Sequence, residues 1–332
     1  MWQYIARRFL YMIFTVWVIS LIAFWVIQLP PGDFVTTMVG RLVAAGGGAS
    51  VPQLEQQLRQ EYGLDQPVYV QYFKWINNIL TKGQFGYSFN YQEDARQIIL
   101  ERLPITFAIS SLSIVFIWLV ALPIGIFSAV NKYTWGDYLA TFVGFIGLAV
   151  PNFLLALILM YLSYKYLGQA MIGLFSPEYA SAPWTLAKVW DLFKHMLIPV
   201  VIIGAGGTAG LIRTMRANLL DELNKPYVET ARAKGLPERQ LLLKYPVRYA
   251  LNPFISTIGW ILPGLVAGEV IVSIVLNLPT SGPILLQSLM TEDMYVAAGF
   301  LLVLSALTVI GTFISDLLLV WLDPRIRLVK VG

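Results

Sequence analysis

Long apolar segments alternate with short polar ones over most of the chain. Each apolar segment is about 20 residues or longer, the length that an α-helix needs to cross the hydrocarbon core of a bilayer. The pattern therefore predicts an all-α integral membrane protein with six transmembrane helices. The predicted spans are residues 9–29, 104–130, 138–166, 196–215, 254–276 and 296–322.

Two of these spans carry residues that change how a helix runs or packs. Pro151 interrupts the third span, where a proline removes a backbone hydrogen bond and can bend the helix. The fourth span contains four glycines, and small residues let neighbouring helices approach closely in a membrane. We expect tight helix packing there, at Gly204, Gly206, Gly207 and Gly210.

The polar segments divide the chain into three parts. The longest polar region, residues 33–102, follows the first span and shows helical periodicity between residues 52 and 80. We expect an N-terminal part, residues 1–103, made of the first transmembrane helix and this region. A transmembrane core, residues 104–322, and a short tail, residues 323–332, follow it.

Composition and charge agree with a membrane protein. Hydrophobic residues make up 57% of the 332-residue chain and charged residues 13%, whereas soluble domains carry about 25% charged residues. Lysine and arginine gather before the first span, between the fourth and fifth spans, and after the sixth. Because positive residues favour cytoplasmic segments, we expect a multi-pass protein with both termini in the cytoplasm and residues 33–102 outside.

Few side chains are available for catalysis or for binding metals and cofactors. The chain has no cysteine, which excludes disulfides and cysteine metal sites, and His195 is its single histidine. A lone histidine at an outer membrane edge is more often structural than catalytic. No phosphate-binding G-x-x-x-x-G-K-[ST] loop is present, so we expect this chain to bind no ATP and no other cofactor.

The most polar stretch of the core is residues 227–253, between the fourth and fifth spans. Good helix formers from Glu229 to Lys234 predict a short helix. Gly235 would end this helix, and Pro237 follows at the usual distance for a helix stop. A second helical piece begins near Glu238 and is bounded by prolines. The stretch predicts a compact hairpin of two helices on the cytoplasmic side.

This hairpin resembles the EAA loop of bacterial ABC-importer permeases. The resemblance implies a coupling helix that sits in a groove of a separate ATPase and passes its motion to the membrane helices. Small residues on one face would allow the close approach. The alternative is a basic loop that only follows the positive-inside rule; Thr230 also replaces one alanine of the motif. The matching residues are Glu229, Ala231, Ala233, Gly235, Leu236, Pro237 and Pro246.

Further motifs extend the resemblance over nearly the whole chain. In order, they are YIARR at 4–8, PGD at 31–33, YGLDQP at 62–67, RLP at 102–104 and LDPR at 322–325. They are similar to the dipeptide and oligopeptide B-type subunits of the peptide/nickel permease family. The resemblance implies a type I ABC importer permease fold in a bacterial or archaeal plasma membrane, forming half of a pathway for oligopeptides or dipeptides.

Membership of such a family also implies partners. These are a second, homologous permease subunit that gives a heterodimer, two cytoplasmic ATPase subunits that use ATP and Mg²⁺, and an extracytoplasmic substrate-binding protein. This chain is then a transport subunit and not an enzyme. No partner is expected to be a nucleic acid.

The sequence departs from the family pattern near the end of the fifth span. Ser273 stands where the family commonly has a glutamate, and Glu269 lies one helical turn earlier, on the same face. An ionised carboxylate inside a span is costly, so Glu269 should face the bundle interior or a wet cavity. It either lines the translocation route or makes a contact between helices. For Asp316, in the sixth span, we expect a backbone or basic partner.

Alternative functions remain open at this stage. Related permeases carry sugar oligomers, and the altered turn at residues 278–282 leaves oligosaccharide import as a second substrate class. An ion-driven secondary transporter would use intramembrane charges such as Glu269, but it gives the polar hairpin no role.

Overall fold

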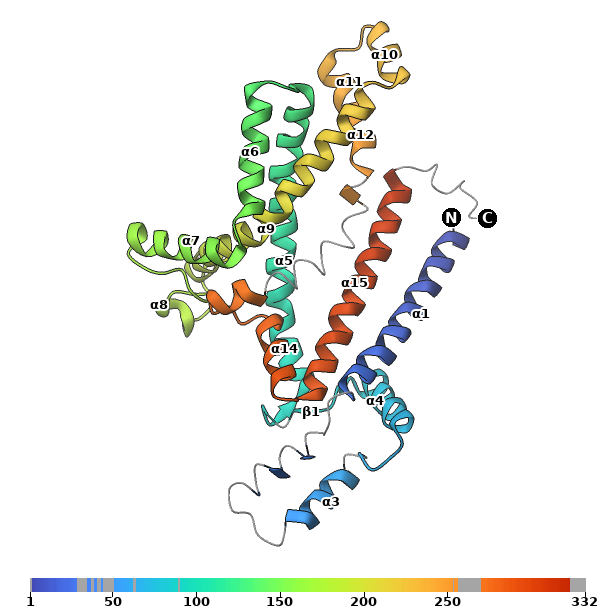
Figure 1. Cartoon of the computed structure of the whole chain (residues 1–332), viewed down its shortest axis with the longest axis vertical. Coiled ribbons are helices and arrows are strands. Elements are labelled where there is room, and N and C mark those ends of the chain that lie inside the picture. The colour runs from blue at the N-terminus through green and yellow to red at the C-terminus, as the bar shows by residue number, and fades with distance from the viewer. Residues whose placement is uncertain are drawn as a thin grey trace. The chain divides into compact units, whose positions relative to one another are not determined.

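The computed structural model describes residues 2–28, 35–36, 39–40, 43, 51–61, 64–88, 90–252, 254–255 and 270–322, and these residues are mostly helical. They belong to two compact units, one of Met1–Met12, Ile105–Thr280 and Thr308–Gly332 and one of Ile13–Pro104 and Ser281–Leu307. The elements in Figure 1 are α1 (Trp2–Ile27), α3 (Val51–Glu61), α4 (Val68–Lys82), β1 (Tyr87–Ser88), β2 (Glu93–Asp94), α5 (Ala95–Val130), α6 (Trp135–Ala149), α7 (Asn152–Leu167), α8 (Pro177–Ala180), α9 (Leu186–Leu223), α10 (Pro226–Ala233), α11 (Glu238–Lys244), α12 (Pro246–Ala250), α14 (Ser281–Met290) and α15 (Met294–Leu322).

Four helices of the described chain are long and apolar enough to cross a membrane, namely α1, α5, α9 and α15. They correspond to the first, second, fourth and sixth spans predicted from the sequence. The predicted fifth span lies mostly outside the described residues. The described helices therefore support a multi-pass protein, with four spans, or five if α6 and α7 together form one.

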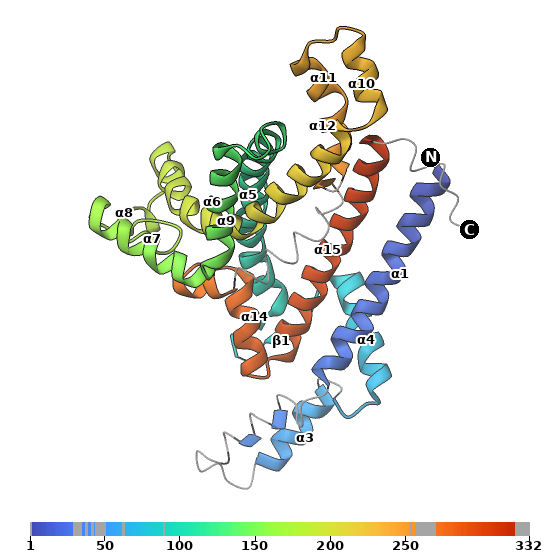
Figure 2. The same ribbon diagram turned by 45° about the horizontal axis from the view of Figure 1, so that its top comes forward.

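The predicted third span consists of two helices that meet at a right angle. α6 ends at Ala149, α7 begins at Asn152, and their axes are bent by 100° (Figures 1 and 2). Pro151 explains the break, because it offers no backbone N–H and holds the preceding Val150 in extended backbone, with φ −85° and ψ 121°. The sequence located the interruption, but the bend is far larger than the kink that it suggested.

Helix α9 begins earlier than the sequence analysis predicted. The fourth span was predicted at residues 196–215, yet α9 starts at Leu186, after Thr185 accepts a hydrogen bond from the Lys188 N–H at 3.3 Å. Its first turns are inside out: Lys188, Asp191 and His195 are buried. The exposed residues of these turns are apolar, namely Leu186, Val189, Trp190 and Phe193. Polar groups turned inward and apolar groups turned outward suit a lipid surround.

The buried polar residues of this segment are all partnered. Lys188 donates to the backbone carbonyls of Ala182 at 2.6 Å and Ala180 at 3.5 Å. Asp191 accepts from the backbone N–H of Ser176 at 2.7 Å and from its hydroxyl at 2.8 Å. These bonds tie the connection between α7 and α9 back onto α9. His195 lies here too, with Nδ1 2.9 Å from the Asp191 carbonyl oxygen, which fits the structural role predicted for it.

Farther along, α9 packs closely on α5 and α6. A β-carbon built on Gly204 would lie 2.5 Å from a ring carbon of Phe116, and one on Gly207 would lie 2.8 Å from Ile117 Cδ1. These two glycines therefore allow α5 to approach α9, as predicted. A β-carbon built on Gly206 would meet only Asn152 Oδ1, at 3.9 Å, and one built on Gly210 would have nothing within 4 Å. The close approach thus depends on two of the four glycines.

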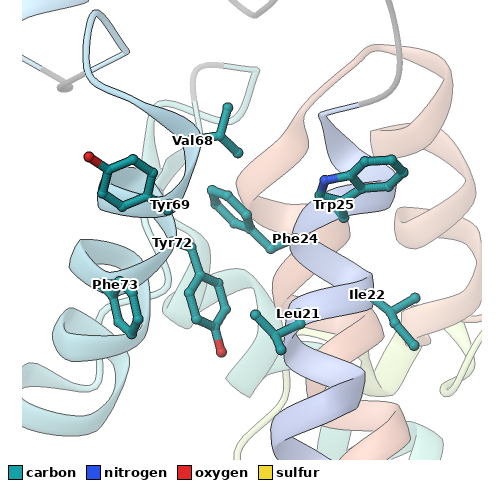
Figure 3. Close-up of a pocket in the computed structure, with 8 residues that line it drawn as sticks. All are labelled: Leu21, Ile22, Phe24, Trp25, Val68, Tyr69, Tyr72 and Phe73. Atoms are coloured by element: carbon teal, nitrogen blue, oxygen red, sulfur yellow. The ribbon is translucent and has the colours of Figure 1, made fainter.

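In the other unit, α4 lies against the C-terminal part of α1. Tyr72 and Trp75 are buried against Phe24, and the Tyr72 hydroxyl lies 2.8 Å from Ser20 Oγ. The Trp75 indole N–H donates to the Phe85 carbonyl at 2.7 Å. Figure 3 shows the apolar groove of about 510 Å³ that the two helices enclose, which is lined by Leu21, Ile22, Phe24, Trp25, Val68, Tyr69, Tyr72 and Phe73.

A small antiparallel hairpin, β1 and β2, connects α4 to α5 and pairs Tyr87 with Asp94 and Ser88 with Glu93. The Ser88 hydroxyl donates to Asp293, the residue before α15. Burial raises the pKa of Asp293, although it also accepts hydrogen bonds from Ser88 and from the backbone N–H of Val296 and Asn90. The Val296 bond caps the start of α15, so this carboxylate ties the hairpin to the helix.

The glycine packing leads to a matched pair of variants in α9. Gly204→Ala should reduce the free energy of unfolding by about 1–3 kcal/mol, because the new methyl group overlaps Phe116. Gly210→Ala should leave the stability unchanged or raise it by up to about 1 kcal/mol, because alanine favours helix and the site is open. Thermal unfolding in detergent measures both. Equal melting temperatures for the two variants would contradict the close approach of α5 and α9.

Candidate functional site

The predicted polar hairpin is a distinct knob at the end of α9. α9 ends at Leu223, α10 begins at Pro226, and α11 and α12 follow directly. Figures 1 and 2 both show α10 and α11 projecting beyond the end of α9. The predicted pattern of helix, break and second helix is therefore present, with the second helical piece divided into α11 and α12 at Pro246.

Gly235 ends α10 in the way that its sequence position predicted. Its φ is +76°, in the left-handed region that favours glycine. The Gly235 N–H donates to the Arg232 carbonyl at 3.0 Å, and the Leu236 N–H donates to the Ala231 carbonyl at 3.4 Å. This is a Schellman motif. A β-carbon on Gly235 would meet nothing within 4 Å, so the glycine is needed for its backbone angle and not for space.

The hairpin has its own small core. Val228, Ala231 and Leu241 are buried together, and Leu236 packs against them from the break. Ala231 therefore lies inside the hairpin, which corrects the expectation that it belongs to a face open to a partner. Pro246 is also buried and opens α12. An apolar interior lets so short a segment hold one shape.

An ion pair closes the hairpin on its outer side. Arg232, in the last turn of α10, donates to Glu238 at the start of α11, with N–O distances of 2.5 and 3.3 Å. Hydrogen bonding from Arg232 lowers the pKa of Glu238 below its ordinary value. Both side chains are more than half exposed, so the pair orients the two helices but contributes little to stability.

The face of α10 that points away from the hairpin core is exposed. Glu229 and Ala233 are exposed four residues apart, and Pro226 and Thr230 are exposed beside them. Residues spaced in this way share one helix face. The outward face thus combines three small or compact residues with a single carboxylate, a surface that allows another backbone to approach closely.

Tyr227 connects the base of the hairpin to α9 and α12. Its hydroxyl donates to Glu222 in the last turn of α9, and its ring lies 5.8 Å from that of Tyr249 in α12, centre to centre. Burial, followed by the Glu222 contact, raises the pKa of Tyr227. The ring also borders a groove of about 740 Å³, whose lining includes Lys225 and Lys234.

The residues proposed for a translocation route lie elsewhere in the chain. Glu269 falls outside the described residues. Ser273 is fully buried, and its carbonyl accepts a hydrogen bond from the Leu278 N–H at 2.8 Å. The turn after it is shaped by Asn277, with φ +50°, and by the Gly173 N–H, which donates to the Leu276 carbonyl at 2.8 Å.

Asp316 has the basic partner that the sequence analysis expected. Its carboxylate lies 3.0 Å from Arg8 Nη1, and Phe9 meets Phe313 beside it, with ring centres 6.3 Å apart. These contacts join the beginning of α1 to the end of α15. Within their compact unit, the beginning of α1 and the end of α15 therefore lie side by side.

The ion pair between Asp137 and Arg216 was not predicted from the sequence. Asp137, at the start of α6, is buried and forms a two-pronged ion pair with Arg216 of α9, at 2.7 and 2.8 Å. In the sequence, Arg216 is one of the basic residues between the fourth and fifth spans that indicate a cytoplasmic segment. An acidic residue in the first turn of an apolar helix was the one available signal, and it did not identify the partner.

Comparisons with known proteins agree with this architecture. Residues 121–328 match the family described as "Binding-protein-dependent transport system inner membrane component", and residues 1–110 match its N-terminal membrane component. The chain is similar to a solved chain of the MetNI methionine ABC transporter, with a TM-score of 0.52 and 17% identity, over 68% of this chain and 97% of that one. At this identity the likeness concerns the fold alone.

Curated relatives match almost from end to end. The oligopeptide permease AppB of Bacillus subtilis is 34% identical over 98% of this chain and 99% of its own. The glutathione permease GsiC of Escherichia coli K12 is 30% identical over 98% and 99%. The oligopeptide permease OppB of Haemophilus influenzae is 26% identical over 98% and 100%. The chain therefore belongs to the family of binding-protein-dependent inner membrane transport components, as an ABC importer permease of the peptide/nickel type.

Proposed function

We propose that this permease subunit forms half of a pathway for oligopeptides or dipeptides, paired with a second, homologous permease. The names of its relatives support the substrate class: two are oligopeptide permeases and one is a glutathione permease, and glutathione is itself a peptide. Peptides are therefore favoured over the oligosaccharides that the altered turn had left open.

The hairpin α10–α12 is the proposed coupling site to separate ATPases. The observation that carries this proposal is the Schellman turn at Gly235, which fixes α10 so that Glu229, Thr230 and Ala233 face outward. A rigid, compact face with one carboxylate suits docking in a partner's groove, where a charge-assisted hydrogen bond is worth about 1.5–3 kcal/mol. ATP and Mg²⁺ would be bound by those partners, and an extracytoplasmic binding protein would deliver the substrate.

The hairpin is proposed to face the cytoplasm, together with both termini. The Arg8–Asp316 pair supports a topology in which the beginning of α1 and the end of α15 lie on the same side of the membrane. The Asp137–Arg216 pair supports a common side for the α5–α6 turn and the end of α9. Positive residues are abundant in the segments concerned, as cytoplasmic segments require.

Glu269 and Ser273 remain the proposed lining of the route. The buried position of Ser273 fits a residue turned toward the interior of the bundle. A carboxylate one helical turn before it would lie on the same face and avoid lipid.

Substitutions at the hairpin should separate insertion from coupling. Gly235→Val should lose ATP-driven uptake in reconstituted vesicles, because a β-branched residue is disfavoured at a φ of +76°. Gly235→Asn is the matched control, since asparagine adopts this conformation more readily, and it should retain most uptake. Glu229→Lys should lose substrate-stimulated ATP hydrolysis through its reversed charge. Full uptake by the valine and lysine variants would remove the hairpin from the coupling role.

Cysteine labelling tests the orientation without background, because the chain contains no cysteine. Gln60→Cys, in α3, should react with a membrane-impermeant maleimide in intact cells. Arg239→Cys, on the exposed part of α11, should react only after the membrane is permeabilised. Labelling in the opposite order would reverse the proposed topology.

Uptake by the assembled transporter tests the substrate class. Vesicles containing both permeases, the ATPases and the binding protein should accumulate a labelled oligopeptide, and unlabelled peptide but not an oligosaccharide should compete. Glu269→Gln should insert normally yet change the rate of peptide uptake if the carboxylate lines the route. Competition by the sugar alone would replace the peptide assignment, and unchanged uptake by the variant would leave Glu269 outside the route.

A further inference from the structure

We propose that the Asp137–Arg216 ion pair is a positioning device for coupling. It fixes the turn between α5 and α6 to α9, so that α5, α6 and α9 move as one body when the hairpin moves. This inference rests on the proposed coupling role of the hairpin, and it assigns to two residues outside the hairpin a part in transmitting its motion.

The geometry of the pair is that of a rigid connection. Arg216 Nε lies 2.8 Å from Asp137 Oδ1, and Arg216 Nη2 lies 2.7 Å from Oδ2. Two parallel hydrogen bonds from a planar guanidinium fix direction as well as distance, which a lysine ammonium does not do. The pair joins positions 79 residues apart in the chain.

The turn between α5 and α6 is built around the same carboxylate. The Ser128 hydroxyl at the end of α5 donates to Asp137 Oδ1, and the Tyr133 N–H donates to Oδ2 at 2.9 Å. Tyr133 has a φ of +64°, a conformation uncommon for a residue with a side chain. The Thr134 hydroxyl caps α6 by accepting from the Asp137 N–H at 3.4 Å. Three parts of the turn thus converge on one buried group.

A buried ion pair is weak evidence for stability alone, because packed apolar residues often serve as well. What a charged, two-pronged pair adds is a single allowed geometry. Asp137 is only 2% exposed, so loss of Arg216 would leave its charge without a counter-ion. Separating the turn from α9 would therefore be costly, so we expect the turn to stay bound to α9 when α9 moves.

The pair lies between the hairpin and a closely packed seam of α9 with α5 and α6. Arg216 lies two helical turns before the end of α9 at Leu223. On its other side, a β-carbon built on Gly125 of α5 would lie 2.6 Å from Met215 Cβ, and one on Gly147 of α6 would lie 3.1 Å from the Ala205 carbonyl oxygen. Close packing leaves α5 and α6 little room to slide on α9, and the ion pair closes this seam at the end nearest the hairpin.

A disulfide can replace the ion pair and so test its role. A β-carbon on Gly144 of α6 would lie 3.7 Å from Ala209 Cβ of α9, within the range of about 3.5–4.5 Å found in disulfides. The chain has no other cysteine, so Gly144→Cys with Ala209→Cys forms one defined, reducible link between the helices. The assay is peptide uptake per ATP hydrolysed by the assembled transporter in vesicles.

Asp137→Asn should lower uptake per ATP by roughly 2- to 30-fold, the range of coupling changes produced by residues outside ligand sites. Oxidation of the cysteine pair in the Asp137→Asn background should restore this ratio, and reduction should remove it again. In the native background the oxidised pair should transport as well as the reduced one. Asp316→Asn is the matched control, because it breaks the Arg8 pair, away from α9, and should leave the ratio unchanged.

Three results would overturn the proposal: an unchanged ratio in Asp137→Asn, a failure of the oxidised link to restore it, or a block of uptake by that link in the native background. The last result would mean that α6 and α9 must separate during transport. Failure of the underlying coupling role would look different, because the Gly235 and Glu229 variants would then transport normally whatever the state of the ion pair.

Discussion

The continuity of α9 is the constraint on which the arrangement of its compact unit depends. Its 38 residues rise about 57 Å, well beyond the hydrocarbon thickness of about 30 Å. One unbroken element therefore carries the inside-out segment at its start, the glycine seam with α5 and α6 in its middle, and the hairpin at its end. Pro199 lies within this helix without ending it. Because the three features lie on one continuous helix, a displacement of one is passed to the others along its backbone, and Pro199 is a point where the helix can bend.

Several charged residues of the described chain connect one element to another. Lys188 holds the loop carbonyls before α9, Asp137 holds Arg216 across α6 and α9, and Arg8 holds Asp316 across α1 and α15. An unpaired charge is costly in an apolar surround, so each pair constrains which elements can be neighbours. Apolar packing alone does not give such selectivity, because an apolar helix face can pack against many other apolar faces. A chain with 13% charged residues uses several of them in this way.

The sequence predicted the helices whose signal is local and missed contacts whose signal is distant. Apolar length located α1, α5 and α15, and the glycine at position 235 located the end of α10. The start of α9 was missed because its polar residues lower the local hydropathy, although Lys188, Asp191 and His195 recur on one helical face. Ala231 was expected on the outside, but α11 folds back and covers it. This burial depends on tertiary packing, which the local sequence does not show. Nothing in a single sequence selects Arg216 as the partner of Asp137.

The inside-out start of α9 also has a consequence for handling the purified protein. Trp190 and Phe193 stack on each other, with ring centres 5.6 Å apart, and both are exposed beside Leu186 and Val189. Once lipid is stripped away, Lys194 leaves this face with a partly exposed polar side chain, while Lys188, Asp191 and His195 are turned inward. Contact between two such faces would then bury apolar area, at roughly 25 cal/mol per Å². Delipidated preparations are thus prone to aggregate through this helix, whereas retained annular lipid keeps its apolar face covered.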